Sequence, residues 1–420
     1  MNTIIQNQRK ERDELLARPY LVRKSNTDTA VLLANPMIKL ITGPRRVGKS
    51  TYALLMLQGK NFAYLNFDDN LLLSDWDEEL VMRTLDEVYP DYEYLLLDEV
   101  QNLKDWDVWV SKLYRRGKNL VITGSNAKML SSDVATTLGG RYITKHILPY
   151  SFSEYLSANN IPYDDMNIAT TSGRADVQRY FAEYFRFGGF PEGAQLASKR
   201  DYLNSVYQKI YIGDIATRNK IDNLFSLRIL FRKMAESVKQ PTSFTRLSNI
   251  IASTGAKLGK ATIINYIEYS KDAFLIYPIK NIADNLTNRE TNPKYYFVDN
   301  GIISILALDI DTSLLENMVA MELIRRYGID ERVFFYNRNI EVDFYIPDAA
   351  LAIQVSYNPH KTDETWQRES TALIKFTKVL DCQRLLILSY DTEETVEVNG
   401  KTIEVMPVWK WLIQDFSKIF

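Results

Sequence analysis

One short segment constrains the fold of this chain more than any other part of the sequence. Residues 43–50 read GPRRVGKS and fit the pattern G-x-x-x-x-G-K-[ST]. The apolar run MIKLIT precedes the segment, and the helix-forming run TYALLML follows it. In the order strand, loop, helix, such a segment turns backbone N–H groups towards a phosphate, and the helix N-terminus adds partial positive charge. The sequence therefore predicts a phosphate-binding loop.

The predicted loop suggests a role for its polar residues. Lys49 is expected to contact the β- and γ-phosphates of a nucleotide, and Ser50 is expected to ligate Mg²⁺. ATP and Mg²⁺ are therefore the cofactors that the sequence predicts. The residues expected to bind the nucleotide are Gly43, Pro44, Arg45, Arg46, Val47, Gly48, Lys49, Ser50, Thr51 and, from a later strand, Asp98.

A second segment supplies two adjacent carboxylates. YLLLDE, residues 94–99, has the apolar run of a buried strand and ends in Asp98 and Glu99. Asp98 would hold Mg²⁺ through water, and Glu99 would orient and polarise the attacking water. The alternative is an acidic pair that only ends a strand. In combination with the loop, the pair favours an ATPase over a simple kinase or GTPase, which explains Glu99 less well.

Two later segments carry further candidates for hydrolysis. The strand pattern NLVITG is followed by Ser125 and Asn126, and either side chain could reach between the carboxylates and the γ-phosphate, unless the segment is only a turn. Arg141 follows two glycines and is either an arginine finger acting across a subunit interface or a surface cation. The predicted catalytic residues are Lys49, Glu99, Asn126 and Arg141.

The order of the patterns predicts an α/β protein of three domains. Between residues 37 and 147, short apolar runs alternate with helical periodicity, which is typical of a parallel sheet with crossover helices. The polar, turn-rich stretch 157–176 marks a boundary, the pattern is helical from about 177 to 280, and strands return in the last third. The predicted domains are residues 1–156, 157–300 and 301–420.

Composition excludes several classes of protein. A hydrophobic content of 46% and a charged content of 25% are those of an ordinary globular chain, not a disordered or fibrous one. The single cysteine, Cys382, excludes a disulfide framework and any multi-cysteine zinc site, and His146 has no companion ligands for a metal. The N-terminus lacks a signal-peptide pattern and no apolar run is long enough to span a bilayer, so we expect a cytoplasmic protein with no membrane partner.

In their order along the chain, the motifs resemble a known family. GPRRVGKST, YLLLDEVQ, LVITGSN, GGRY and PYSFSEYL resemble prokaryotic AAA+-type ATPases that carry a C-terminal domain of unknown function. FGGFPE, YIGDIATRN, KYYFVDNG, LLENMVAMEL and EVDFYI extend this resemblance to about residue 357. The resemblance implies ATP binding and hydrolysis, a winged-helix element after the AAA+-like parallel sheet, and a C-terminal α/β domain of restriction-endonuclease-like fold.

Local charge gives the expected winged helix a possible partner. The net charge is only −2, but residues 239–280 hold six basic and two acidic residues, whereas 64–107 hold two basic and 14 acidic residues. The basic stretch reads helix, glycine-containing turn, helix, and Lys257, Lys260 and Thr262 begin the second helix, where recognition residues meet DNA. Contact with DNA through this region is one interpretation, and a protein partner or homo-oligomer contact is the other.

The last third carries an incomplete set of nuclease-like residues. Asp343 on one predicted strand, Gln354 on the next, and Glu322 or Glu316 on a preceding helix resemble the metal site of PD-(D/E)xK nucleases. Gln354 stands in place of a carboxylate and loses a charge, and Ser356 stands where these nucleases carry lysine. We therefore expect a degenerate site made of Glu322, Asp343 and Gln354.

Three functions are consistent with these patterns. The first is a Mg²⁺-dependent ATPase that couples hydrolysis to a rearrangement of its C-terminal domains, on DNA in one version of the hypothesis. The second is an ATP-regulated nuclease that cuts through Asp343, for which Lys361 could supply the missing cation. The third is a non-catalytic, nucleotide-controlled module that binds protein or nucleic acid.

Overall fold

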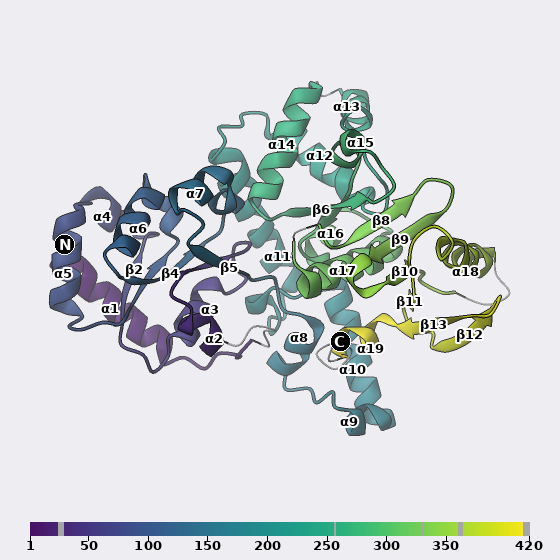
Figure 1. Ribbon diagram of the computed structural model, residues 1–420, viewed down its shortest axis with the longest axis horizontal. Helices are drawn as coiled ribbons and strands as arrows, with labels where there is room; N and C mark the ends of the chain where they lie inside the picture. The colour runs from purple at the N-terminus through teal and green to yellow at the C-terminus, as the bar shows by residue number, and fades with distance from the viewer. Residues whose placement is uncertain (24–28, 256–257, 330, 360–363, 415–420) are drawn as a thin grey trace. The chain divides into compact units, whose positions relative to one another are not determined.

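The chain divides into two compact units in the computed structural model (Figure 1). The first unit comprises residues 1–148 and 272–274, and the second comprises residues 149–271 and 275–420. The structure describes residues 1–23, 29–255, 258–329, 331–359 and 364–414. Within these ranges, no helix combines the length and the apolar character that a membrane crossing needs.

A five-stranded parallel sheet forms the centre of the first unit, in the strand order β2-β3-β4-β1-β5. This sheet confirms the predicted α/β class, and the apolar runs read from the sequence coincide with its strands. The strands are β1 (Ile38–Thr42), β2 (Phe62–Asn66), β3 (Tyr94–Asp98), β4 (Asn119–Gly124) and β5 (Tyr142–His146).

The strand register brings the functional segments to one edge of this sheet. Thr42 at the end of β1 pairs with Gly124 of β4 and with His146 of β5. Asn66 at the end of β2 pairs with Asp98 of β3. Because all five strands run in the same direction, the loops that follow them share the carboxyl edge, where ligands of open α/β sheets bind.

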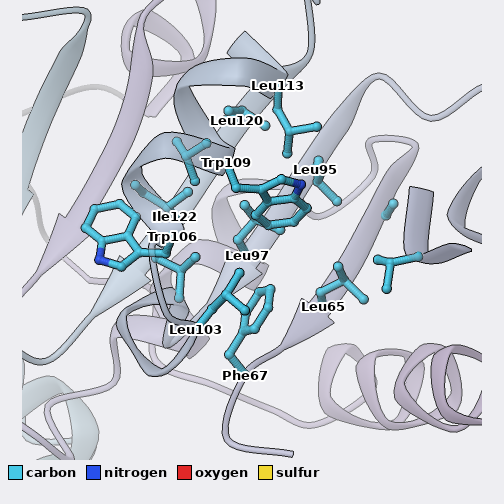
Figure 2. Close-up of a cluster of buried hydrophobic side chains, with 14 of the residues drawn as sticks. Leu65, Phe67, Leu95, Leu97, Leu103, Trp106, Trp109, Leu113, Leu120 and Ile122 are labelled. Carbon is cyan, nitrogen blue, oxygen red and sulfur yellow. The ribbon is translucent and has the colours of Figure 1, made fainter. Parts of the chain in front are cut away.

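The helices of the first unit supply much of the apolar cover of this sheet. Figure 2 shows Leu65 and Leu97 of neighbouring strands packed with Phe67, and with Trp109 and Leu113 of helix α6. The helices are α1 (Asn2–Leu16), α2 (Thr29–Ala34), α3 (Lys49–Met56), α4 (Asn70–Ser74), α5 (Glu78–Val88), α6 (Trp106–Arg115) and α7 (Ser132–Thr137), with 3₁₀ turns η1 (Val100–Asn102) and η2 (Ala127–Leu130).

A mixed eight-stranded sheet forms the centre of the second unit, in the order β12-β13-β11-β10-β9-β8-β6-β7. Its strands are β6 (Ile276–Asn281), β7 (Lys294–Phe297), β8 (Phe334–Asn337), β9 (Glu341–Ile346), β10 (Leu351–Val355), β11 (Arg384–Ser389), β12 (Glu394–Val398) and β13 (Lys401–Pro407). The strands before residue 300 therefore share one sheet with those of the last third, and the predicted 300/301 domain boundary falls within that sheet.

Helices cover and precede this second sheet. Helix α17 is buried at every position from Ser313 to Ile324, so it is covered on all sides and not on one face only. The helices are α8 (Phe152–Ala158), α9 (Asp165–Ala169), α10 (Thr171–Phe187), α11 (Lys199–Gln208), the π-helix η4 (Lys209–Thr217), α12 (Leu224–Glu236), α13 (Phe244–Ser253), α14 (Lys260–Asp272), α15 (Leu286–Thr291), α16 (Asn300–Leu306), α17 (Asp311–Tyr327), α18 (Glu364–Phe376) and α19 (Val408–Ile413), with 3₁₀ turns η3 (Pro191–Gly193) and η5 (Pro347–Ala349).

Two of the family-like motifs, FGGFPE and KYYFVDNG, meet at Asp299. Its carboxylate accepts hydrogen bonds from the backbone N–H of Gly189 at 2.7 Å and of Gly301 at 2.8 Å. Burial raises the pKa of Asp299 to about 7. A Cβ at Gly188, whose φ is +70°, would lie 1.7 Å from an Asp299 carboxylate oxygen. The motifs therefore serve packing, because only glycine leaves room for this buried carboxylate.

Candidate nucleotide site and a second lysine-carboxylate cluster

The phosphate loop joins β1 to α3 and depends on its glycines. Gly43 has φ +146° and Gly48 has φ +86°, conformations that glycine adopts at little cost. A Cβ at Gly43 would lie 2.1 Å from the backbone oxygen of Ile147, in the segment after β5. The first glycine of the motif is therefore required by a close approach of two backbones.

Lys49 lies buried at the start of α3, next to a carboxylate. Its Nζ donates a hydrogen bond to the backbone oxygen of Pro44 at 2.9 Å and lies 3.5 Å from Oε1 of Glu99. The Lys49 side chain is 3% exposed and that of Glu99 is 10% exposed. The structure thus brings together the loop lysine and the predicted water-orienting glutamate.

Asp98 ends β3 in a buried, polar environment. Its Oδ1 accepts a hydrogen bond from the Thr123 hydroxyl at 2.5 Å, and its Oδ2 accepts one from the Tyr64 hydroxyl at 3.3 Å. Burial, and then the charge of Glu99, raise the pKa of Asp98 to about 6, while hydrogen bonds from Thr123 and Ser50 oppose the rise. Ser50 and Asp98 together offer the oxygen ligands that Mg²⁺ prefers, so the donor set fits this ion.

Glu99 is held in one orientation by several donors. Its φ of +50° is unusual for a residue with a side chain, and its N–H donates to the Thr123 hydroxyl at 3.0 Å. Its Oε2 accepts hydrogen bonds from Ser125 at 3.0 Å and from Gln101 at 2.5 Å. Burial alone would raise the pKa of Glu99, but the Lys49 charge and these donors outweigh it and lower the pKa. Glu99 is therefore an ionised carboxylate near neutral pH.

The other predicted residues of the loop take different positions. Arg45 is partly buried, and its charge contributes to the low pKa of Glu99. Arg46 is exposed and has φ +61°. Val47 is buried and Thr51 is partly buried in the first turn of α3.

Ser125 contacts Glu99, whereas Asn126 and Arg141 make other contacts. The Asn126 side-chain oxygen accepts a hydrogen bond from the N–H of Lys128 at 2.8 Å and so caps η2. Arg141 is exposed, and its backbone oxygen accepts a hydrogen bond from Ile38 at the beginning of β1, one strand length from the phosphate loop. A role for Arg141 in an intersubunit site, and a role for Asn126 at the γ-phosphate, stay predictions.

Two residues near the site were not singled out from the sequence. The guanidinium of Arg23 donates to the backbone oxygens of Val47 at 2.9 Å and Leu148 at 2.7 Å, and so ties the loop to the end of the unit. Gln101, which contacts Glu99, stands in the motif YLLLDEVQ two positions after it. The sequence gives no signal for Arg23, because its partners are backbone atoms.

A second buried lysine lies among carboxylates in the second unit. Nζ of Lys294, on β7, is 3.2 Å from Oε1 of Glu316, 3.4 Å from Oε1 of Glu341 and 3.5 Å from Oδ1 of Asp343. Tyr296 donates a hydrogen bond to the same Glu316 oxygen at 2.7 Å. The Lys294 side chain is fully buried, whereas that of Glu341 is 52% exposed, so the cluster meets solvent on one side.

The pKa values of this cluster show an excess of negative charge. Burial disfavours the ammonium of Lys294, but Glu316, Asp343 and Glu341 outweigh burial and raise the pKa of the lysine. Burial raises the pKa of Glu316 to about 7, and although Lys294 opposes this rise, the charge of Asp343 adds to it.

The nuclease-like residues are only partly brought together. Glu316 joins Asp343 through Lys294, whereas Glu322 is hydrogen-bonded to Arg325 at 3.1 Å and Arg326 at 2.7 Å. The helix carboxylate of the predicted site is thus replaced by Glu316, because Glu322 points to its own helix neighbours.

The side-chain amide of Gln354 is hydrogen-bonded to the backbone of β9. Its Oε1 accepts from the N–H of Asp343 at 2.8 Å, and its Nε2 donates to the backbone oxygen of Glu341 at 2.9 Å. Ser356 is buried, and Lys361 lies outside the described residues. Among the residues that the structure describes, no group of three or more His, Cys, Asp or Glu side chains is arranged to hold a metal ion. The donor set of a nuclease metal site does not fit here, because an ammonium lies between its carboxylates.

The basic region 239–280 is only partly described. Lys260 is exposed at the first position of α14, Thr262 is partly buried, and Lys257 lies outside the described residues. Further along α14, Lys271 pairs with Glu268 at 2.8 Å. The exposed face of this helix therefore carries both signs of charge.

Family models match two parts of the chain. A model described as an AAA domain matches residues 35–156, and one described as a domain of unknown function, DUF8612, matches residues 178–314. Among solved structures, the Walker-type ATPase PABY2304 of Pyrococcus abyssi is similar with a TM-score of 0.43 and 14% identity, over 70% of this chain and all of that chain.

Two relatives match nearly the whole chain. The uncharacterized protein MJ1544 of Methanocaldococcus jannaschii is 32% identical over 406 residues, which cover 92% of this chain and 90% of that protein. An uncharacterized protein of Haemophilus influenzae is 30% identical over 403 residues, which cover 90% of this chain and 94% of that protein. The chain therefore belongs to the protein family of these archaeal and bacterial relatives, and its phosphate loop lies in an AAA domain.

Proposed function

We propose that this protein binds ATP with Mg²⁺ at the phosphate loop, hydrolyses it, and couples hydrolysis to a rearrangement of its C-terminal domains. The observation that carries the proposal is the position of Glu99, an ionised carboxylate 3.5 Å from the loop lysine and hydrogen-bonded to Ser125 and Gln101. A carboxylate at this place is ionised and oriented to accept a proton from an attacking water, and its basicity rises once Lys49 turns from it to the phosphates.

Each residue of the site has a distinct task in this proposal. The backbone N–H groups of the loop receive the phosphates, and Lys49 exchanges its partners Pro44 and Glu99 for phosphate oxygens. Ser50 and Asp98 would hold Mg²⁺, which when bound neutralises phosphate charge. Glu99, released from Lys49, takes the proton of the water that attacks the γ-phosphorus, and ADP leaves with the bridging oxygen.

The test separates binding from hydrolysis. Lys49→Ala should abolish both, because the β- and γ-phosphates lose the buried lysine that contacts them in this scheme. Glu99→Gln should retain ATP binding and lose at least about a hundredfold in phosphate release, since the base is gone. Lys60→Ala, an exposed lysine after α3, is the matched control and should change neither.

ATP binding, phosphate release and a DNA-cleavage assay together decide between the alternatives. A wild-type chain that neither binds nor hydrolyses ATP contradicts the proposal. Binding without turnover favours the nucleotide-controlled binding module, and Mg²⁺-dependent cleavage of DNA that Asp343→Ala abolishes favours the nuclease.

We also propose that the helical region after the first unit is a winged helix that contacts nucleic acid. The consecutive helices α12, α13 and α14 and the exposed Lys260 at the start of α14 support it. Lys260→Ala should weaken DNA binding and reduce its salt dependence by about one phosphate contact. Equal affinity of both chains at low and high salt would contradict a contact through this helix.

A further inference from the structure

The Lys294 cluster joins three elements that are far apart in the sequence. Lys294 comes from β7, Glu316 from α17, and Glu341 and Asp343 from β9. The ammonium lies 3.2 to 3.5 Å from one oxygen of each carboxylate. The side chains of Glu316 and Asp343 are only 4% and 14% exposed. Their negative charges need a cation beside them, because uncompensated charge is strongly disfavoured in the interior.

An ammonium and a divalent cation cannot share this position. Mg²⁺ and Ca²⁺ bind oxygen ligands at about 2.0–2.6 Å, so a metal would need the point from which these oxygens now contact Nζ. The Lys294 side chain is fully buried, and its ammonium lies within 3.5 Å of all three carboxylates. The cation at the centre is therefore part of the chain.

The neighbouring oxygen atoms that could ligate a metal are already hydrogen-bonded. The second oxygen of Asp343 accepts a hydrogen bond from the N–H of Val355 at 2.9 Å. The Gln354 amide is bonded at both of its ends to the backbone of Asp343 and Glu341, so it does not face the cluster as a ligand. The position that a nuclease fills with a second strand carboxylate thus supplies neither charge nor a free oxygen.

We propose that the Lys294 ammonium occupies the place of a divalent cation, and that this cluster is a metal-free junction that binds β7 to α17 and β9. With the ammonium in place, no three acidic side chains of the described residues form a metal site. Removing the ammonium should let the three carboxylates close around a divalent cation. The inference is independent of ATP hydrolysis, which concerns the first unit.

Manganese binding to the full chain without nucleotide tests the proposal. Mn²⁺ would be titrated into wild type, Asp343→Asn, Lys294→Met, and the double variant Lys294→Met with Asp343→Asn. Wild type and Asp343→Asn should bind the same amount of Mn²⁺, Lys294→Met should bind one additional equivalent, and the double variant should lose it. Any Mn²⁺ bound near Asp98 is common to all four chains and cancels in the comparison.

Thermal unfolding gives a second readout. In Lys294→Met, Mn²⁺ at about a hundred times its dissociation constant should raise the melting temperature by roughly 3–5 °C, and wild type should not respond. Lys280→Met, which removes a lysine paired with Glu290 and Glu331 near the surface, is the control and should gain no Mn²⁺.

Two outcomes would overturn the proposal. One is a folded Lys294→Met chain that binds no additional Mn²⁺. The other is a wild-type chain that loses one Mn²⁺ equivalent on the single change Asp343→Asn, which would show a metal site beside the lysine. The second comparison decides the question even where Lys294→Met does not fold.

Discussion

Both units place a buried lysine next to carboxylates, but the two clusters differ in balance. Lys49 faces one carboxylate at 3.5 Å and a backbone oxygen, at the end of a glycine-containing loop. Lys294 faces three carboxylates at 3.2 to 3.5 Å, from a strand and two neighbouring elements. The ammonium of a lysine with one weak carboxylate partner can leave it for an incoming anion, whereas the ammonium of a lysine with three carboxylate partners stays in place.

The pKa values of Glu99 and Glu316 shift in opposite directions, which reflects the same difference. The pKa of Glu99 is lowered, since one lysine and several donors serve one carboxylate. The pKa of Glu316 is raised to about 7, since burial and a neighbouring aspartate outweigh a lysine that is shared. The first arrangement keeps a base ionised, and the second concentrates negative charge around a fixed cation.

The largest expected effect comes from Lys294→Met. Leaving three carboxylates without their cation should lower the free energy of unfolding by about 3–5 kcal/mol. Lys280→Met, whose partners are half exposed, should cost less than about 1 kcal/mol. Denaturant unfolding of both variants measures the contrast, and equal losses would break it.

Gly43→Ala should be the next largest. The added Cβ would lie 2.1 Å from the Ile147 oxygen, so the loop must shift and ATP affinity should fall by roughly a hundredfold. Gly59, with φ +80°, also has a positive φ but no atom within 4 Å of an added Cβ, so Gly59→Ala should leave ATP affinity unchanged. Nucleotide titration of both variants is the measurement, and unchanged affinity in Gly43→Ala would mean that the loop tolerates the displacement.

The pH dependence of stability should follow Glu316. Its pKa rises from 4.5 in the unfolded chain to about 7 in the folded chain, so the folded state holds an extra proton between these values. The free energy of unfolding should therefore fall as pH rises from about 4.5 to 7, by on the order of 2 kcal/mol. Glu316→Gln should reduce this slope in urea titrations at several pH values, and the raised pKa values of Asp98 and Asp299 should account for the slope that is left. A slope that persists unchanged in the variant would assign it to other groups.

The smallest expected effect separates two adjacent residues. Ser125→Ala removes a hydrogen bond to Glu99 and should lower kcat by about three- to tenfold with little change in KM. Asn126→Ala removes a cap from η2 and should cost about 1 kcal/mol of stability instead. Steady-state phosphate release and unfolding of the two variants measure the difference. A larger loss of kcat in Asn126→Ala than in Ser125→Ala would favour a role for Asn126 at the γ-phosphate.

The first site could be predicted because its chemistry is local. The loop from Gly43 to Ser50 is one continuous segment, and Asp98 and Glu99 end a strand whose apolar run marks it as buried. The choice between Ser125 and Asn126 could not be made so, since it depends on where β4 ends and on the turn that Asn126 caps.

The second cluster could not be predicted from spacing. Lys294 stands in the strand KYYF, and nothing near it in the sequence indicates that it contacts Glu316 or Asp343. Helix α17 is buried all round, so its pattern does not show which of Glu316 and Glu322 turns towards the sheet. Contacts that long-range packing decides leave no periodic signal.

Gln354 shows how small a chemical difference separates two kinds of site. Its amide oxygen accepts a hydrogen bond from the backbone of Asp343 and its amide nitrogen donates one to the backbone of Glu341, so strands β9 and β10 stay joined at this point. A carboxylate of the same shape could do only the first and would turn lone pairs against the Glu341 carbonyl. The amide nitrogen therefore makes Gln354 a residue that holds two strands together. Gln354→Glu alone would weaken the pairing of β9 and β10 before it supplied a metal ligand.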